Sequence, residues 1–293
     1  MLPLALLLAL RAECSWASFA GPATEQLQCE EATVTASSML LQARQATVKG
    51  GFDADELEAR GAIALVEDHR RGLDLHVMHN QGGHDPQDLQ ALKSWMGKLD
   101  QMFRDRGMAV TEGNSGQQPA HKEQVRYNEW ATNGHLSTLC ETGFNAGHSA
   151  LRFLALSEAH VYEFDLGEHP YAMPAEGFLT DSFPGRLNVT WGDSTRTLPS
   201  FHEAHPLVKC SLMIVDGGHS YEVALSDLKS FAKMAADEHI LAIDDTPCAK
   251  SYCEGPTRAW AELTASGCIE QLERVPMGAG RGFSVGRYAS REC

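Results

Sequence analysis

Five short apolar segments in the second half of the chain each end in an acidic residue or in a glycine beside one. Each segment is short enough for a buried strand, and the five span 136–141, 160–166, 187–192, 211–216 and 239–244. The residues at their carboxyl ends are Glu141, Asp165, Gly192-Asp193-Ser194, Asp216 and Asp244-Asp245. One such residue could cap a helix, but five in succession favour a shared binding edge, because ligands bind at the carboxyl ends of parallel strands.

The first of these ends continues as a glycine-rich loop, Glu141-Thr142-Gly143-Phe144-Asn145-Ala146-Gly147. A dinucleotide fingerprint would need glycine where Asn145 and His148 stand, and the phosphate loop G-x-x-x-x-G-K-[ST] is absent from the sequence. Because no Lys or Arg lies within 141–150 to bind a pyrophosphate, the loop suits a nucleoside without phosphates. Asp165 can accept hydrogen bonds from ribose hydroxyls, and these carboxylates favour a positively charged nucleoside.

Three carboxylates from two neighbouring strand ends, Asp216, Asp244 and Asp245, would make an oxygen-rich site. Oxygen ligands favour Mg²⁺ over zinc, and Mg²⁺ could hold two adjacent oxygens of a substrate and lower the pKa of a hydroxyl. His219 could take the hydroxyl proton. Other roles remain open: Asp245 could cap the turn at Thr246-Pro247, His219 could hydrogen-bond within its loop, and Asp216 could face the cofactor.

The alternation of strand and helix patterns predicts an α/β fold, a Rossmann-like, doubly wound and mostly parallel sheet. Helices are expected over 149–158, 221–236 and 257–266. Two final strands, 268–275 and 282–288, are joined by the glycine-rich segment 277–281, which is short enough for an antiparallel hairpin.

Upstream of the sheet, the chain is expected to be an N-terminal helical extension. Its clearest pattern is an apolar stripe that we interpret as core packing, made of Leu89, Leu92, Met96, Leu99 and Phe103. We expect a signal peptide over 1–20, a helical N-terminal region over 21–112, a linker or lid over 113–133 and a cofactor-binding domain over 134–293. The helical region could be a lid, an acceptor-binding domain or an oligomer contact.

Residues 136–288 resemble a class I S-adenosylmethionine-dependent methyltransferase. The pattern E-x-G-x-x-x-G at Glu141–Gly147, the acid Asp165, the segment Gly192–Ser194 and the closing hairpin follow the order of that family. The segment Asp216-Gly217-Gly218-His219-Ser220-Tyr221-Glu222, followed 28 residues after its Asp by Asp244-Asp245, looks closer to one branch. That branch contains macrolide-sugar O-methyltransferases and cephalosporin-hydroxylase-like proteins.

The resemblance implies a role for each strand end. Cofactor contacts would come from the first four ends, through Glu141, Gly143, Asn145, Gly147, Asp165, Asp193, Ser194 and Asp216. Asp216, Asp244 and Asp245 would be ligands of a divalent metal, Mg²⁺, and His219 would be the general base. The expected activity is a Mg²⁺-assisted O-methyltransferase that uses S-adenosylmethionine on a small hydroxylated acceptor, with Asp216 and His219 as its catalytic residues.

Two other functions remain open at the level of sequence. One is an accessory or non-catalytic cofactor-binding protein, because some relatives in the same branch are associated with hydroxylation. The other is an enzyme for NAD or a nucleotide sugar on a similar sheet, although the missing loop glycine and the missing basic phosphate clamp weigh against it. A homo-oligomer is also possible.

Composition limits the partners and the compartment. The net charge of −15 argues against nucleic acid, and no apolar run reaches the ~18 residues of a membrane span. The apolar run Leu2–Leu10 and the small-x-small pattern Ser18-Phe19-Ala20 indicate a signal peptide and a secretory or lumenal location, with a cytoplasmic or plastid protein as alternatives. A lumenal enzyme would need its cofactor delivered from the cytosol.

Cysteines and a glycosylation sequon also bear on the compartment in which the protein works. There are eight cysteines and no C-x-x-C motif, and cleavage of the signal peptide would leave seven. Cys248 and Cys253 could bridge in an oxidising compartment. Asn188-Val189-Thr190 is a glycosylation sequon, but it lies in an expected buried strand, so we expect it to stay unmodified.

Overall fold

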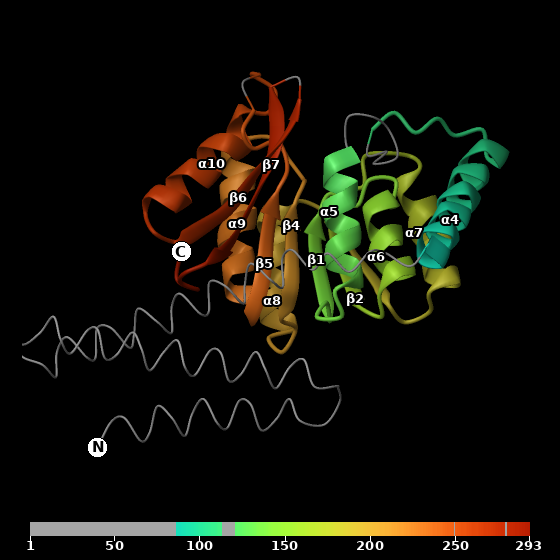
Figure 1. The fold of residues 1–293 in the computed structure, drawn as a ribbon, viewed down its shortest axis with the longest axis horizontal. Coiled ribbons are helices and arrows are strands. Elements are labelled where there is room, and N and C mark those ends of the chain that lie inside the picture. The colour runs from blue at the N-terminus through green and yellow to red at the C-terminus, as the bar shows by residue number, and fades with distance from the viewer. Residues whose placement is uncertain (1–85, 113–120, 249, 279) are drawn as a thin grey trace, which may run out of the picture. The chain divides into compact units, whose positions relative to one another are not determined.

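The computed structural model describes residues 86–112, 121–248, 250–278 and 280–293 (Figure 1). The predicted signal peptide and most of the predicted N-terminal helical region lie outside these residues. Within the described ranges, seven strands form one sheet in the spatial order β3-β2-β1-β4-β5-β7-β6. They are β1 (Thr138–Thr142), β2 (His160–Asp165), β3 (Leu187–Trp191), β4 (Cys210–Val215), β5 (Ala235–Ile243), β6 (Ile269–Gly278) and β7 (Arg281–Tyr288).

The strand directions confirm the predicted fold class. Strands β1 to β5 are parallel, and β7 lies antiparallel between β5 and β6. The chain order reverses between β1 and β4, because β2 and β3 extend to one side of β1 while β4 and β5 extend to the other. In such sheets the ligand crevice lies outside the strand ends at this switch point.

Helices cover both faces of the sheet. They are α4 (Pro86–Asp105), α5 (His121–Thr132), α6 (His148–Leu156), α7 (Ala172–Ser182), α8 (Ser194–Ala204), α9 (Tyr221–Met234) and α10 (Glu254–Ala265). Alternate strand residues separate the two hydrophobic clusters, because Leu212 and Ile214 face α4 to α7 while Met213 and Val215 face α8 to α10. The sheet is therefore buried on both faces, as its apolar strands require.

Helix α4 follows the predicted apolar stripe. Leu92, Leu99 and Phe103 are buried, and the helix packs on α6. The burial of these side chains makes α4 part of the same hydrophobic cluster as the sheet.

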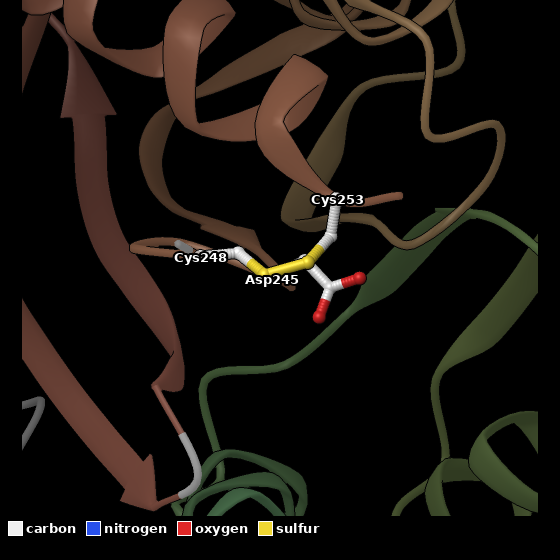
Figure 2. A group of neighbouring side chains, drawn as sticks. All are labelled: Asp245, Cys248 and Cys253. Atoms are coloured by element: carbon white, nitrogen blue, oxygen red, sulfur yellow. A yellow bond between two sulfur atoms is a disulfide. The ribbon is translucent and has the colours of Figure 1, made fainter. Parts of the chain in front are cut away.

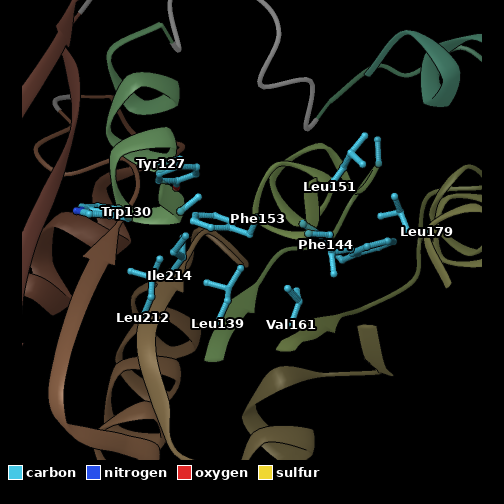
Figure 3. Close-up of a cluster of buried hydrophobic side chains, with 14 of the residues drawn as sticks. Tyr127, Trp130, Leu139, Phe144, Leu151, Phe153, Val161, Leu179, Leu212 and Ile214 are labelled. Atoms are coloured by element: carbon cyan, nitrogen blue, oxygen red, sulfur yellow. The ribbon is translucent and has the colours of Figure 1, made fainter. Parts of the chain in front are cut away.

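Helix α5 begins inside the segment predicted to be a linker or lid. The Gly-, Gln- and Ser-rich composition ends before residue 121, and Tyr127, Trp130 and Ala131 then recur at helical spacing. All three are buried, and Figure 3 shows Tyr127 and Trp130 on α5 beside Phe153 of α6 and strand residues such as Leu139. The structure therefore differs from the linker prediction, because this apolar face packs over the sheet.

Strand β3 differs from the prediction that it is a buried strand. It pairs only with β2 and forms an edge of the sheet described here. Its second residue, Asn188, is exposed, and the rest of the strand is only half-buried. The local apolar pattern could not distinguish an edge strand from a central one, because sheet order depends on long-range pairing.

All six cysteines in the described ranges are paired, as Cys140–Cys210, Cys248–Cys253 and Cys268–Cys293. The first pair joins neighbouring strands β1 and β4, and the last ties the C-terminus to the start of β6. The second is the bridge that the sequence suggested. Cys14 and Cys29 lie outside the described residues. No helix in the described ranges is long and apolar enough to span a membrane.

Candidate active site

The glycine-rich loop after β1 packs directly against the end of β4. Gly143 has a φ of 103°, and a Cβ atom there would lie 2.1 Å from the carbonyl oxygen of Asp216. A side chain at this position is therefore excluded by both conformation and space. Gly147, with a φ of 74°, precedes α6 as its N-cap. The structure thus brings the first and fourth strand ends together, as the sequence predicted.

Glu141 lies at the base of this loop and is fully buried. Its Oε2 accepts a hydrogen bond of 2.8 Å from the Ser149 hydroxyl, and its Oε1 is buried with no partner among the described residues. Burial raises the pKa of Glu141 to about 7. A hydrogen bond shared with Glu163 on the neighbouring strand β2 is the contact within the protein that can satisfy this carboxyl group.

Sequence analysis missed Glu163, which stands opposite Glu141 in the β1–β2 register. It is fully buried, and burial together with the charge of Glu141 raises its pKa well above the ordinary range. Glu163 is therefore the protonated member of the pair at neutral pH. A polar residue at a position predicted to be buried was the signal that could have identified it.

Asp165 holds the backbone around the cofactor loop. Its Oδ2 accepts from the backbone N–H of Asn145 at 2.8 Å, and its Oδ1 accepts from that of Gly167 at 2.7 Å. Asn145 adopts a positive φ of 49°, and its side-chain Oδ1 is buried without a partner among the described residues. The carboxylate keeps lone pairs for a ligand, since each oxygen can accept more than one hydrogen bond.

Asp193 is the N-cap residue of helix α8. Its Oδ1 accepts from the backbone N–H of Thr195 at 3.0 Å and from the Thr195 hydroxyl at 2.7 Å. These bonds lower the pKa of Asp193. Ser194 begins the helix and hydrogen-bonds toward Asp227, a buried carboxyl of α9 that sequence analysis missed.

The two acidic residues after β5 share one cation. Asp244 and Asp245 are 9% and 1% exposed, and the guanidinium of Arg281 donates to both. Its Nε lies 2.5 Å from Asp245 Oδ1, and its Nη2 lies 3.2 Å from Asp244 Oδ2. Burial, followed by the charge of Asp245, raises the pKa of Asp244 to about 6. Sequence analysis missed Arg281, which is the basic residue of the predicted hairpin turn.

The second oxygen of Asp244 remains available, whereas that of Asp245 lies against His219. Asp244 Oδ1 and Asp245 Oδ2 are buried and accept no hydrogen bond from the described residues. His219 is close to one of them, with its Nε2 lying 3.3 Å from Asp245 Oδ2. The His219 side chain is 45% exposed, so it links a buried carboxylate to the solvent side of the site.

Asp216 and Glu123 add two more carboxyls to this region. Asp216 follows β4 and is exposed at the solvent side of the site. Glu123 is buried on α5 and accepts a hydrogen bond of 3.0 Å from the Tyr127 hydroxyl. Burial, followed by the charge of Asp244, raises the pKa of Glu123 to about 8. Sequence analysis missed Glu123 because its helix was predicted to be a linker.

The predicted metal ligands do not form a closed cluster. In the described part of the chain, the one set of three potential ligands whose atoms come within 4.8 Å of one another is Asp245, Cys248 and Cys253. Figure 2 shows that the two sulfurs are bonded to each other beside the Asp245 carboxylate. A disulfide offers no thiolate for metal binding, so this set is not a zinc site in this state. The unpartnered oxygens of Asp244 and Asp245 are oxygen donors that fit Mg²⁺.

Comparisons with known proteins agree with this geometry. A family model described as a methyltransferase domain matches residues 140–246. No curated protein sequence matches the chain. The fold resembles the O-methyltransferase TomG from Streptomyces achromogenes, involved in tomaymycin synthesis, solved with S-adenosylmethionine. That likeness has 12% identity and a TM-score of 0.52, and it covers 66% of this chain and 89% of TomG.

A second similar structure is the O-methyltransferase from Bacillus cereus in complex with SAH, the demethylated form of the cofactor. It is 12% identical with a TM-score of 0.52, and the likeness covers 73% of this chain and 96% of that one. At these identities the structures establish a shared fold, and the domain match rests on the sequence of residues 140–246. Residues 140–246 therefore match a methyltransferase domain, and the sheet around them has the fold of the methyltransferase structures above.

Proposed function

We propose that this chain transfers the methyl group of S-adenosylmethionine to an oxygen atom of a small hydroxylated acceptor. The observation that carries the proposal is the pair formed by His219 and the buried Asp245, whose Nε2 and Oδ2 atoms are 3.3 Å apart. The pair lies on the loops after β4 and β5, beside the loop that packs Gly143 against Asp216.

The pair is suited to remove a proton from a hydroxyl. The negative charge of Asp245 faces Nε2 of His219 and favours a proton on that nitrogen, which leaves Nδ1 as the basic atom. Arg281 fixes the other oxygen of Asp245, so the carboxylate cannot turn away. The exposure of His219 lets an acceptor reach it. General-base catalysis of this kind contributes roughly 10²–10⁴-fold to a rate.

The chain also offers acceptors for a cationic cofactor. S-adenosylmethionine, when bound, supplies a methyl group on a positively charged sulfur. Asn145 Oδ1 is buried without a partner in the described residues and can accept a hydrogen bond from a cofactor. Glu141, which shares a hydrogen bond with Glu163, keeps further lone pairs for the same purpose. Asp165 orders the loop that carries Asn145, because its carboxylate accepts a hydrogen bond from the backbone N–H of that residue. Asp193 and Ser194, at the start of α8, are proposed to flank the adenine.

A magnesium requirement is a separate part of the proposal. Asp244 would hold the ion through its unpartnered Oδ1, with Asp216 as a further ligand, whereas Asp245 Oδ2 would bind the ion only in place of its contact with His219. Bound Mg²⁺ would lower the pKa of the acceptor hydroxyl and orient it. Arg281 already neutralises part of the negative charge of Asp244 and Asp245. The ion would therefore compete with the guanidinium for these two carboxylates.

We also propose that the protein works in the secretory pathway or a lumen. Three disulfides among the described residues support this location, because disulfides persist in oxidising compartments. The cofactor would then have to be transported into that compartment.

The decisive experiment measures cofactor binding and methyl transfer separately. S-adenosylhomocysteine is titrated calorimetrically into the full chain, with Mg²⁺ and again with EDTA. Methyl transfer is then measured on a panel of sugars, catechols and glycosides. Micromolar binding and transfer to a hydroxyl would support the proposal, and loss of transfer in EDTA would support the magnesium part.

Two other outcomes would overturn it. Binding without transfer to any acceptor would favour an accessory cofactor-binding protein. Transfer to nitrogen or carbon alone would reject the oxygen-directed reaction, while leaving the domain assignment unchanged.

A further inference from the structure

Asn188 belongs to the one Asn-x-Ser/Thr sequon in the sequence, Asn188-Val189-Thr190, and it lies on the edge strand β3. The residue is exposed, although the strand pattern predicted burial. Among the described residues its side-chain amide makes no hydrogen bond that it would lose on modification. The middle residue is Val and not Pro, so the sequon is complete.

The folded structure leaves room for a bulky group at this position. Asn188 lines an open groove of about 580 Å³ between β3 and α8. The groove also presents the half-buried Trp191, whose ring can pack against a sugar face, and Arg196 and Ser200, which can hydrogen-bond to hydroxyls. A substituent on the Asn188 amide would therefore enter solvent and this groove without entering the core.

N-glycosylation needs an accessible sequon and also passage of the chain through an oxidising compartment. The disulfides support that passage. All six cysteines of the described ranges are paired, and two of the bridges link segments 70 and 25 residues apart in sequence. N-linked glycans are added in that same compartment. The leader-like segment at the start of the sequence points the same way.

We propose that Asn188 is an N-glycosylation site. The amide nitrogen of Asn188 attacks the anomeric carbon of a lipid-pyrophosphate-linked oligosaccharide, a C–N bond forms and the C–O bond to pyrophosphate breaks. The lipid pyrophosphate leaves, and the amide proton goes to the transferase. The transfer takes place on the chain before β3 pairs, and the folded domain then carries the sugar on its open edge.

The glycan would also protect the sheet. An exposed edge strand presents unpaired backbone groups that can pair with another chain. A sugar on Asn188, the second residue of β3, would block such pairing sterically. This inference depends on the proposed compartment and is independent of the methyl-transfer reaction.

The test uses the full chain, expressed with residues 1–20 intact in cultured animal cells. Trypsin releases Leu187–Arg196 as one peptide, because Arg186 and Arg196 flank it. Treatment with peptide N-glycosidase in heavy-oxygen water should convert Asn188 to labelled Asp, which mass spectrometry reads directly. The intact protein should move faster on a gel after the same treatment.

Matched variants separate the sequon from general effects of mutation. Asn188→Gln and Thr190→Ala should abolish the gel shift, whereas Thr190→Ser keeps the sequon and should retain it. An unmodified Leu187–Arg196 peptide in secreted wild-type protein would overturn the proposal. So would a chain that stays in the cytosol with free thiols and unmodified Asn188.

Discussion

The Nε atom of Arg281 donates to Oδ1 of the buried Asp245 at a distance of 2.5 Å. The two residues are 36 positions apart, and the contact joins the loop after β5 to the start of β7. A cation built into the chain thus occupies one side of the carboxylates that would bind a divalent ion.

Removing the charge of Arg281 should strengthen divalent-ion binding. We expect Arg281→Gln to bind Mn²⁺, a spectroscopic substitute for Mg²⁺, at least about tenfold more tightly, because a nearby positive charge no longer repels the ion. Arg281→Lys keeps the charge and should bind like wild type. Free Mn²⁺ is measured by paramagnetic resonance during titration. Equal affinities for all three proteins would show that the ion does not bind beside this residue.

Replacing His219 should impair turnover but not cofactor binding. His219→Ala should lower kcat by roughly 10²–10⁴-fold while the Kd for S-adenosylhomocysteine stays near that of wild type. His160→Ala is the matched control, because His160 is exposed at the opposite end of β2. A His219 variant with wild-type kcat on an accepted substrate would exclude the general-base role.

The stability of the fold should depend on pH through Asp227. Burial raises its pKa to about 7, from an ordinary value of 3.8. The native state then binds one proton more than the unfolded state between these values, so the free energy of unfolding falls as pH rises from about 4 to about 7. The contribution lost is up to about 4 kcal/mol, from 1.36 kcal/mol for each pKa unit.

Denaturant unfolding between pH 4 and 8 tests this dependence. Asp227→Asn cannot titrate and should flatten the curve in that range. Asp181→Asn, at an exposed position on α7, should leave the wild-type slope unchanged. If the slope survives in Asp227→Asn, the proton is bound elsewhere.

The three disulfides should differ in their contribution to stability. Closing a loop lowers the entropy of the unfolded chain, and the sequence separations are 70, 25 and 5 residues. Replacing both cysteines by alanine should cost about 4.4 kcal/mol for Cys140–Cys210, about 3.5 for Cys268–Cys293 and about 2 for Cys248–Cys253. Denaturant titrations of the three double variants give the order. The reverse order would mean that native packing, and not loop closure, dominates.

Helix α4 should behave as part of the core. Leu99 is fully buried against α6 and its neighbours, so Leu99→Ala should lower the free energy of unfolding by about 2–5 kcal/mol. Leu207→Ala, at a side chain that is 93% exposed, is the control and should change little. If Leu99→Ala leaves the free energy of unfolding unchanged, α4 is not part of the core and could act as a lid.

The sequence predicted the parallel strands and the residues at their ends because both depend on local patterns. Short apolar runs identified β1 to β5, and the acids that follow them belong to the loops at one edge of the sheet. Helix α4 was predicted for the same reason, from the regular spacing of Leu92, Leu99 and Phe103.

The features missed by sequence analysis depend on long-range packing. Glu123 reaches the site because α5 packs over the sheet, and nothing near residue 123 in the sequence shows which surface its helix will cover. Arg281 reaches Asp245 through the antiparallel insertion of β7 beside β5. The exposure of Asn188 follows from the position of β3 at the sheet edge, which the composition of the strand does not reveal.

The Cys140–Cys210 bridge has a consequence for the connectivity of the molecule. It closes residues 140–210 into a covalent ring that contains Asp165, Asp193 and the strands β2 and β3. A single proteolytic cut anywhere within 141–209 would therefore leave both fragments in one covalently linked molecule. The part of the chain that would hold the nucleoside stays tethered to the strand that leads to His219, even when the backbone between them is broken.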